Sequence, residues 1–358
     1  MGRLVALDAV GDISFVDAMR RAWEAGDAVL PVDPRLPAAA ARRLVDVLRV
    51  GEPVDDGDAL VVATSGTTGE PKGVVLTHAA IAASADATSR RLAVDPATDR
   101  WLACLPLAHV GGLGVVLRAV HTGTPLVVHS SFDPEAAEAS GATLVSLVAT
   151  ALGRLHDPAR FRTIVLGGAA PPEVVPRNTV ITYGMTETGS GVVYDGVPLD
   201  GVEVRVDEAG GIELRGPMLL RAYRDGTDPK DDDGWLATGD LGTWDGARLA
   251  VHGRASDLII SGGENVWPAA VERVIAGLAG VAEVAVAGRP DPEWGQRVVA
   301  VVVAADPAAP PALADVRDAV KAAIGPWAAP KELELVTALP RTALGKVRRG
   351  DLGAPPRD

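Results

Sequence analysis

Alternating apolar and polar segments dominate the chain between Ala59 and about residue 200. Helical periodicity over 78–90 predicts a helix, and Thr77 is a suitable N-cap for it. Strands that alternate with helices indicate a mostly parallel sheet covered on both faces. Short apolar runs predict these strands from Ala59 onward and at 74–76, 101–105, 125–129, 143–148, 163–166 and 179–182.

The patterns differ before and after this central part. Residues 1–50 predict short helices at 14–25 and 37–49 around Pro-rich turns. After Pro198 the chain becomes strand-rich with tight turns, as in VEVRV and GIELRG, which indicates a smaller, more antiparallel lobe. From Asp257 a βαββαβ order predicts a compact α+β unit with elements at 258–260, 268–279, 281–287, 297–304, 312–324 and 332–336.

Together these patterns predict an α/β fold. We expect a large N-terminal domain over 1–255, with mostly parallel sheets plus a small antiparallel lobe, and a mobile α+β C-terminal domain over 257–358. The length of 358 residues suits two or three domains.

Composition excludes several classes of function. The net charge of −13 argues against a surface for nucleic acid or anionic membrane, because both attract basic patches. The single Cys104 excludes an intramolecular disulfide and a multi-cysteine zinc site. The N-terminal stretch carries Asp8 and Asp12 and does not read as a signal peptide, and no apolar run approaches the roughly 20 residues of a membrane span. We therefore expect a cytoplasmic protein.

The strongest local signal is the sequence TSGTTGEPKG at 64–73. Its glycines let backbone N–H groups approach phosphate oxygens, its hydroxyls add neutral donors, and a lysine supplies a cation. It is not a Walker loop, which requires G-x-x-x-x-G-K-[ST]. The alternative is a polar hairpin between two strands. The candidate phosphate-binding residues are Thr64, Ser65, Gly66, Thr67, Thr68, Gly69 and Lys72.

This loop, followed by LTH, resembles the phosphate-binding loop of the adenylate-forming superfamily. Its members are acyl- and aryl-CoA ligases, firefly luciferases and the adenylation domains of peptide synthetases. The resemblance covers about residues 59–350, and further motifs follow in the family's order: LGGAAP at 166–171, YGMTETG at 183–189, TGD at 238–240, GRASDLI at 253–259 and PRTALGK at 340–346.

The resemblance implies a nucleotide site. Tyr183 would stack on adenine, Thr186 would contact the α-phosphate, and Glu187 would ligate Mg²⁺, which prefers hard oxygen ligands. Lys346 would bridge the carboxylate and the α-phosphate during adenylation, where an ammonium stabilises developing charge. The remaining candidates are Gly168, Ala169 and Gly184 near the adenine, and Asp240 and Arg254 at the ribose.

The resemblance also implies a site for the acid and for a thiol. His109 resembles the family's gate beside the acyl pocket, although a helix-capping or core histidine is the alternative. Ser256 is the predicted hinge for rotation of the C-terminal domain between two half-reactions. The substrate candidates are Gly167, Gly189 and Ser190, the last with Ser65 as a partner for a second carboxylate, and the CoA candidates are Gly262, Gly263 and Glu264.

The predicted activity is that of an ATP- and Mg²⁺-dependent acid–thiol ligase, which forms an acyl-AMP and then an acyl-CoA. The phosphate loop starts at position 64, about a hundred residues earlier than is typical of the family, so we expect a reduced N-terminal part. This compact form and the run YGMTETGSGVVYDGVPLDG most resemble the short actinobacterial o-succinylbenzoate–CoA ligases of menaquinone synthesis.

Alternatives stay open at this point. The acid could belong to another aryl- or fatty-acyl-CoA ligase, or the acceptor could be a separate carrier, although no Gly-Gly-x-Ser carrier site occurs in the chain. A nucleotide-binding protein without catalysis is a different class of function. The expected partners are a small carboxylic acid, ATP and CoA, and the choice between a monomer and a homodimer stays open.

Overall fold

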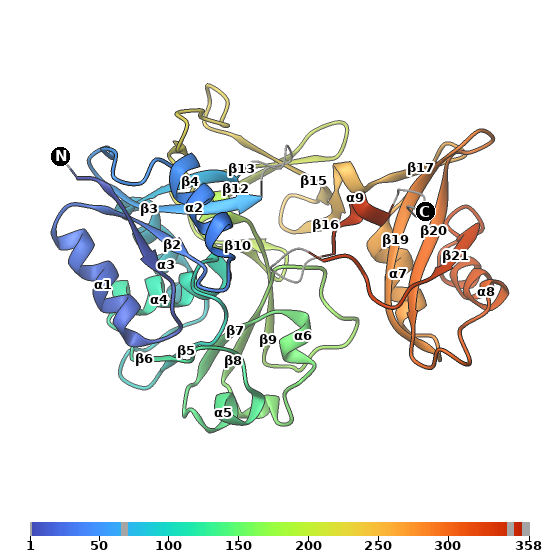
Figure 1. The fold of residues 1–358 in the computed structure, drawn as a ribbon, viewed down its shortest axis with the longest axis horizontal. Coiled ribbons are helices and arrows are strands. Elements are labelled where there is room, and N and C mark those ends of the chain that lie inside the picture. Colours follow the sequence, from blue (N-terminus) through green and yellow to red (C-terminus); the bar gives the residue numbers. More distant parts are fainter. Residues whose placement is uncertain (1, 66–70, 342–346, 353–358) are drawn as a thin grey trace. The chain divides into compact units, whose positions relative to one another are not determined.

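The computed structural model describes residues 2–65, 71–341 and 347–352 (Figure 1). The chain divides into two compact units. The first unit comprises residues 1–207, 212–238 and 244–250, and the second comprises residues 208–211, 239–243 and 251–358. The domain boundary expected at Ser256 stays a prediction.

A five-stranded sheet in the order β1-β2-β3-β4-β14 holds the N-terminal part of the first unit. Strands β1 to β3 are parallel, β4 is antiparallel to β3, and β14 is antiparallel to β4. Two helices accompany the sheet (Figure 1). The elements are β1 (Leu4–Asp8), α1 (Ile13–Glu24), β2 (Ala28–Val32), α2 (Ala38–Val47), β3 (Asp58–Ser65), β4 (Pro71–Thr77) and β14 (Ala222–Tyr223).

The prediction for residues 1–50 is therefore wrong in part. Both helices are confirmed, but the two strands were missed. All five residues of AVLPV in β2 are buried, so this strand shows no alternation of apolar and polar positions. Pro31 reads as a turn in the sequence, yet it pairs with Leu7 inside a parallel ladder.

A seven-stranded sheet in the order β11-β10-β9-β8-β7-β5-β6 forms the rest of the first unit's frame. Strands β5 to β9 pair in parallel, as their apolar runs predicted, and β10 is antiparallel to β9. The predicted cap at Thr77 is confirmed, because its side chain accepts a hydrogen bond from the Ala80 amide. The elements are α3 (His78–Arg91), β5 (Trp101–Ala103), α4 (Val110–Thr122), β6 (Leu126–Val128), α5 (Pro134–Ala139), β7 (Leu144–Leu147), α6 (Ala149–Leu152), η1 (Pro158–Arg160), β8 (Thr163–Leu166), β9 (Thr179–Gly184), η2 (Thr186–Thr188), β10 (Gly191–Tyr194) and β11 (Val197–Pro198).

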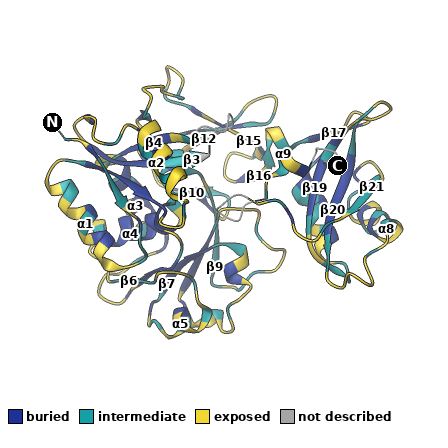
Figure 2. Ribbon diagram, in the orientation of Figure 1, coloured by how far each residue is buried: buried dark blue, intermediate teal, exposed yellow. Residues whose placement is uncertain are grey.

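The small lobe predicted after Pro198 is a four-stranded sheet in the order β12-β13-β15-β16, with β12 and β13 antiparallel. Its strands are β12 (Glu203–Val206), β13 (Gly211–Arg215), β15 (Leu236–Trp244) and β16 (Leu249–Arg254). Figure 2 shows that buried residues follow the strands, whereas exposed residues follow the outer side of helices such as α1. The apolar runs of the sequence therefore supply the cores.

The second unit has the predicted α+β composition around a sheet in the order β18-β17-β20-β19, with β21 parallel to β20. Its core contains Val271, Ile275, Val286 and Val298, which are fully shielded from solvent. The short strand β18 was not predicted. The elements are η3 (Ala255–Asp257), β17 (Ile259–Ser261), β18 (Glu264–Val266), α7 (Pro268–Ala276), β19 (Val281–Asp291), β20 (Gly295–Ala304), α8 (Leu313–Ala323), β21 (Glu332–Leu335) and α9 (Arg349–Leu352).

Two further observations bear on the predicted class of protein. None of the helices within the described residues combines the length and the apolar character that a membrane crossing requires. Cys104 directly follows β5 and is buried, and this burial raises the pKa of its thiol to about 12. The thiol therefore stays protonated and is a poor nucleophile.

An ion pair to a buried carboxylate fastens β14 to the first sheet, and its loss should be costly. Arg221 donates from Nε and Nη2 to the two carboxylate oxygens of Asp58, at 2.8 and 2.9 Å, and the Asp58 side chain is only 1% exposed. Arg221→Ala leaves this carboxylate without a counter-charge. We expect a loss of about 2–4 kcal/mol in the free energy of unfolding, measured by urea titration.

Arg215 supplies the matched control. Arg215 binds Glu203 with the same two-pronged geometry, but both side chains are solvent-exposed. Arg215→Ala should therefore cost less than about 1 kcal/mol. A loss for Arg221→Ala no larger than for Arg215→Ala would contradict the role given to the ion pair with the buried Asp58 carboxylate.

Candidate functional site

The predicted phosphate loop joins β3 to β4. The two strands are antiparallel, and Thr64 lies opposite Lys72 at the end next to the connecting loop. The Lys72 side chain is exposed, and its Nζ lies 4.8 Å from the centre of the Tyr223 ring. Ser65 is described only as part of β3. Four loop candidates, together with Lys346, lie outside the described residues: Gly66, Thr67, Thr68 and Gly69.

Several predicted residues follow the carboxyl ends of neighbouring parallel strands. Gly167 and Gly168 come directly after β8, and Tyr183 and Gly184 close β9. His109 comes after β5 by a short loop. Since the carboxyl ends of parallel strands meet at one edge of a sheet, the fold brings these residues together at the edge where α/β proteins bind ligands. Gly168 has φ of 87° and Ala169 is exposed, so little side chain covers this edge.

The turn over 184–190 presents Thr186 and Glu187. Thr188 is fully buried, and its Oγ1 donates to the carbonyl oxygen of Ser190 at 2.7 Å. Gly184 is required here, because a Cβ at this position would lie 2.1 Å from the same carbonyl oxygen. With the turn fixed in this way, Thr186 and Glu187 lie half-buried in η2.

The carboxylate of Glu187 has one described side-chain donor. The hydroxyl of Tyr223 donates to Glu187 Oε1 at 3.0 Å. Burial and then the Glu187 charge raise the pKa of Tyr223, so its hydroxyl remains a donor. No group of three or more His, Cys, Asp or Glu side chains able to hold a metal occurs in the described part of the chain. A lone carboxylate fits Mg²⁺, which takes one or two protein carboxylates and completes its shell with phosphates and water.

The two predicted ribose residues, both in the second unit, are neighbours. Arg254 ends β16 and Asp240 lies in β15. Arg254 Nε is 3.0 Å from Asp240 Oδ1, and the Asp240 side chain is 10% exposed. The arginine therefore orients the carboxylate that would accept hydrogen bonds from a diol.

The predicted CoA residues form a tight hairpin. Gly262 and Gly263 make the two-residue turn between β17 and β18, with φ values of 62° and 85°. Both residues of a type I′ turn need positive φ, which explains the glycine pair. Glu264 is exposed and begins β18. The predicted hinge residue Ser256 is exposed in η3.

The sequence analysis missed Arg118, which is fully buried in α4. Its Nη1 donates to Ser190 Oγ at 3.3 Å, and its Nη2 donates to Ser146 Oγ at 3.2 Å. Its Nε is buried without a hydrogen-bond partner, and within the described residues it forms no ion pair with a carboxylate. Burial lowers the pKa of Arg118 from its ordinary value.

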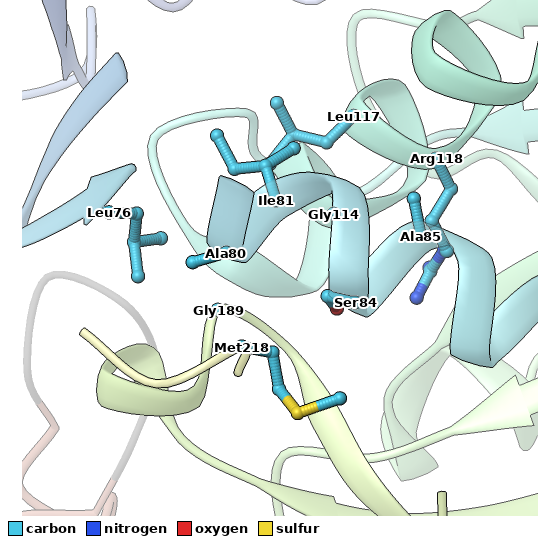
Figure 3. A pocket seen from close by; sticks show the side chains of 10 residues that line it. All are labelled: Leu76, Ala80, Ile81, Ser84, Ala85, Gly114, Leu117, Arg118, Gly189 and Met218. Carbon is cyan, nitrogen blue, oxygen red and sulfur yellow. The ribbon is translucent and has the colours of Figure 1, made fainter. Parts of the chain in front are cut away.

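Arg118 lines a small pocket. Figure 3 shows the pocket between α3, α4 and the segments that carry Gly189 and Met218. Small residues leave the space open, since Gly114 and Gly189 have no side chain and α3 contributes alanines and a serine. The one signal in the sequence was an arginine within the apolar run VGGLGVVLRAV. The pocket-lining residues are Leu76, Ala80, Ile81, Ser84, Ala85, Gly114, Leu117, Arg118, Gly189 and Met218.

His109 occupies the N-cap position of α4, but its side chain does not cap the helix. Its Nε2 is buried without a hydrogen-bond partner in the described part of the chain and lies 3.9 Å from Asp33 Oδ2. The Asp33 carboxylate is held by Arg35. The structure thus places His109 beside a buried carboxylate, and this histidine is not among the residues that line the pocket of Arg118.

Comparisons with known proteins agree with this geometry. The sequence pattern of the AMP-binding enzyme family matches residues 47–223, and that of the AMP-binding enzyme C-terminal domain matches residues 270–346. The probable 2-succinylbenzoate–CoA ligase of Mycobacterium tuberculosis (strain H37Rv) is 41% identical, over 89% of this chain and 91% of the relative. The chain belongs to the AMP-binding enzyme family.

Further relatives lead to the same family. The 2-succinylbenzoate–CoA ligase of Listeria monocytogenes (strain F2365) is 36% identical, over 82% of this chain and 69% of the relative. The structure of o-succinylbenzoate-CoA synthetase from Bacillus subtilis in complex with the acyl-adenylate intermediate has a TM-score of 0.89 at 27% identity, and the match covers 99% of this chain and 89% of that one. The predicted fold class and superfamily are confirmed, whereas the roles of individual residues in this AMP-binding enzyme stay predictions.

The partly buried His109 should make stability depend on pH. Burial lowers the pKa of His109, Asp33 opposes this shift, and Arg35 reinforces it. As the pH falls below about 6.5, the unfolded chain gains a proton that the folded state resists, so stability is lost on acidification, by at most about 1.4 kcal/mol per pH unit. In His109→Gln we expect a smaller loss between pH 7 and pH 5, measured by urea unfolding. Equal losses in the variant and the wild type would contradict the assignment.

Proposed function

We propose that this AMP-binding enzyme converts 2-succinylbenzoate into 2-succinylbenzoyl-CoA through an acyl-adenylate. The relatives from Mycobacterium tuberculosis and Listeria monocytogenes carry the name of this ligase. Similar structures are those of the Bacillus subtilis synthetase with its acyl-adenylate intermediate and with ATP and a magnesium ion. The reaction takes ATP, CoA and the acid as substrates and Mg²⁺ as cofactor. We also propose a cytoplasmic location, which fits a chain whose single cysteine is a buried thiol.

The reaction has two steps. An oxygen of the acid's carboxylate attacks the α-phosphorus of ATP, a P–O bond forms, and pyrophosphate leaves with the electrons of the broken bond. The CoA sulfur then attacks the acyl carbonyl, a C–S bond forms, AMP leaves, and the thiol proton passes to solvent. Mg²⁺, when bound, supplies positive charge that stabilises the phosphates.

We assign the chain's residues to these steps as follows. Lys72 and the hydroxyls of its loop bind the phosphates, and Thr186 contacts the α-phosphate. Glu187 provides the oxygen ligand for Mg²⁺, and Asp240, oriented by Arg254, binds the ribose. The adenine lies between Tyr183 and the backbone of Gly168. Lys346 stabilises the charge that develops during adenylation, and Ser256 is the hinge that moves it away before thioester formation.

The observation that carries the choice of acid is the buried guanidinium of Arg118. A charge without a counter-ion is costly to bury, and a ligand carboxylate is the chemistry that would offset this cost. 2-Succinylbenzoate has one carboxylate to activate and a second one on its ring. We propose that the ring carboxylate binds Arg118, which lines the pocket, and Ser190, which accepts a hydrogen bond from Arg118. A fatty acid would leave the guanidinium unpaired.

Arg118→Met tests this assignment, because methionine keeps much of the volume and removes the charge. For 2-succinylbenzoate we expect kcat/KM, measured by pyrophosphate release, to fall about 100-fold. For 4-oxo-4-phenylbutanoate, which lacks the ring carboxylate, wild type and variant should react equally. The thermal midpoint should stay unchanged or rise, because the variant no longer buries an unpaired charge.

Each readout separates the proposal from its alternatives. An equal loss with both acids, or a lower thermal midpoint without change in specificity, would make Arg118 a structural residue. Faster turnover of a fatty acid than of 2-succinylbenzoate by the wild type would favour another acyl-CoA ligase. Absence of pyrophosphate release with every acid would favour a nucleotide-binding protein without catalysis.

Lys346→Ala tests the division of the two steps. Because the ammonium is proposed to act only in adenylation, the rate of pyrophosphate release should fall by about 10²–10³. Thioester formation from supplied 2-succinylbenzoyl-AMP and CoA should remain within about threefold of the wild type. A comparable loss in both half-reactions would contradict a role confined to the first step. Lys331→Ala, which removes a lysine elsewhere in the same C-terminal unit, controls for the loss of a charge in adenylation.

A further inference from the structure

Tyr223 is fixed beside the phosphate loop by the backbone of β14. This two-residue strand pairs with β4, so that Tyr223 lies opposite Val74. Backbone hydrogen bonds on both sides of it, from Arg221 to Val75 and from Arg224 to Gly73, hold the strand in place. The position of the Tyr223 side chain is therefore set by the same strand that carries Lys72.

The Tyr223 side chain contacts two groups of opposite charge. Its ring lies under the Lys72 ammonium, 4.8 Å from Nζ to the ring centre, and its hydroxyl donates to Glu187 Oε1 at 3.0 Å. Lys72 comes from the first sheet and Glu187 from the turn after β9. Tyr223 is thus the described side chain that connects the two motifs.

This arrangement keeps both charges available for a ligand. Lys72 and Glu187 form no ion pair with each other within the described residues, although both contact the same phenol. A direct ion pair would have to be broken before phosphate and metal could bind. The hydroxyl stabilises the Glu187 carboxylate and the ring face stabilises the Lys72 ammonium, each only weakly. Both charges can therefore still bind ligands.

We propose that Tyr223 is a positioning residue for the complex of ATP with Mg²⁺, orienting the Glu187 carboxylate through its hydroxyl and the Lys72 ammonium through its ring. The inference rests on the proposed function for the identity of the nucleotide and the metal. Hydrogen bonds that orient a metal ligand commonly change metal affinity by about 10–100-fold when they are removed.

Calorimetric titration of ATP tests the inference without relying on turnover, in MgCl₂ and in EDTA. Tyr223→Phe removes the hydroxyl and keeps the ring. Its affinity for ATP should be about tenfold weaker than that of the wild type in MgCl₂ and unchanged in EDTA. Tyr223→Leu removes the ring as well and should weaken binding under both conditions. Tyr194→Phe, which removes a phenol hydroxyl from a buried contact with Thr88, should bind as the wild type does.

A double-mutant cycle with Glu187→Gln shows whether Tyr223 acts through Glu187. If it does, the Mg²⁺-dependent losses of the two single variants should not add in Tyr223→Phe/Glu187→Gln. Additive losses, or a Tyr223→Phe protein with the metal dependence of the wild type, would overturn the inference. Should Tyr223→Phe fail to fold, Tyr223→Trp takes its place in the ATP titrations in MgCl₂ and in EDTA, since tryptophan keeps a ring face and lacks the hydroxyl. Absence of pyrophosphate release by the wild type would instead count against the proposed function.

Discussion

A guanidinium buried in α4, with no carboxylate partner among the described residues, is the constraint on which the proposed specificity depends. Arg118 is surrounded by the Trp101 ring, two serine hydroxyls and the apolar packing of α3 against α4. Neutral hydroxyls compensate a buried charge only in part, so the unliganded fold carries a cost that a bound anion removes. We propose that this cost makes the site selective, because an acid without a second carboxylate cannot supply this compensation.

The proposed nucleotide chemistry depends on a different feature, the edge of the seven-stranded sheet at which the carboxyl ends of its parallel strands meet. Strands β5, β8 and β9 deliver a histidine, a glycine pair and the YGMTETG turn to that edge. The first sheet contributes Lys72 through a hairpin, and Tyr223 connects it to Glu187. The backbone sets the positions of Lys72 and Glu187, and both side chains contact the neutral phenol of Tyr223. We propose that these contacts keep the two charges from pairing with each other before substrate binds.

The sequence predicted most of the second sheet and most of the α+β unit, because apolar runs bounded by turn residues carry a clear signal. It missed β2, whose five buried residues show no alternation and include Pro31. Among the proposed functional residues, the sequence pointed only to those within contiguous motifs, and their roles stay predictions. Arg118 and Tyr223 were missed because their significance arises from packing: one is buried by the neighbouring helix, and the other is brought to Glu187 by a two-residue strand. No local pattern encodes such contacts.

The central claim is that the chain-end carboxylate of a diacid attacks the α-phosphorus of ATP while the ring carboxylate stays bound to Arg118. Isotope transfer tests it directly. With 2-succinylbenzoate labelled with ¹⁸O in its chain carboxylate, ATP, Mg²⁺ and CoA, the AMP formed should carry one ¹⁸O atom, detected by mass spectrometry. With the label in the ring carboxylate, the AMP should carry none. Unlabelled AMP in the first case, labelled AMP in the second, or formation of ADP would contradict the account.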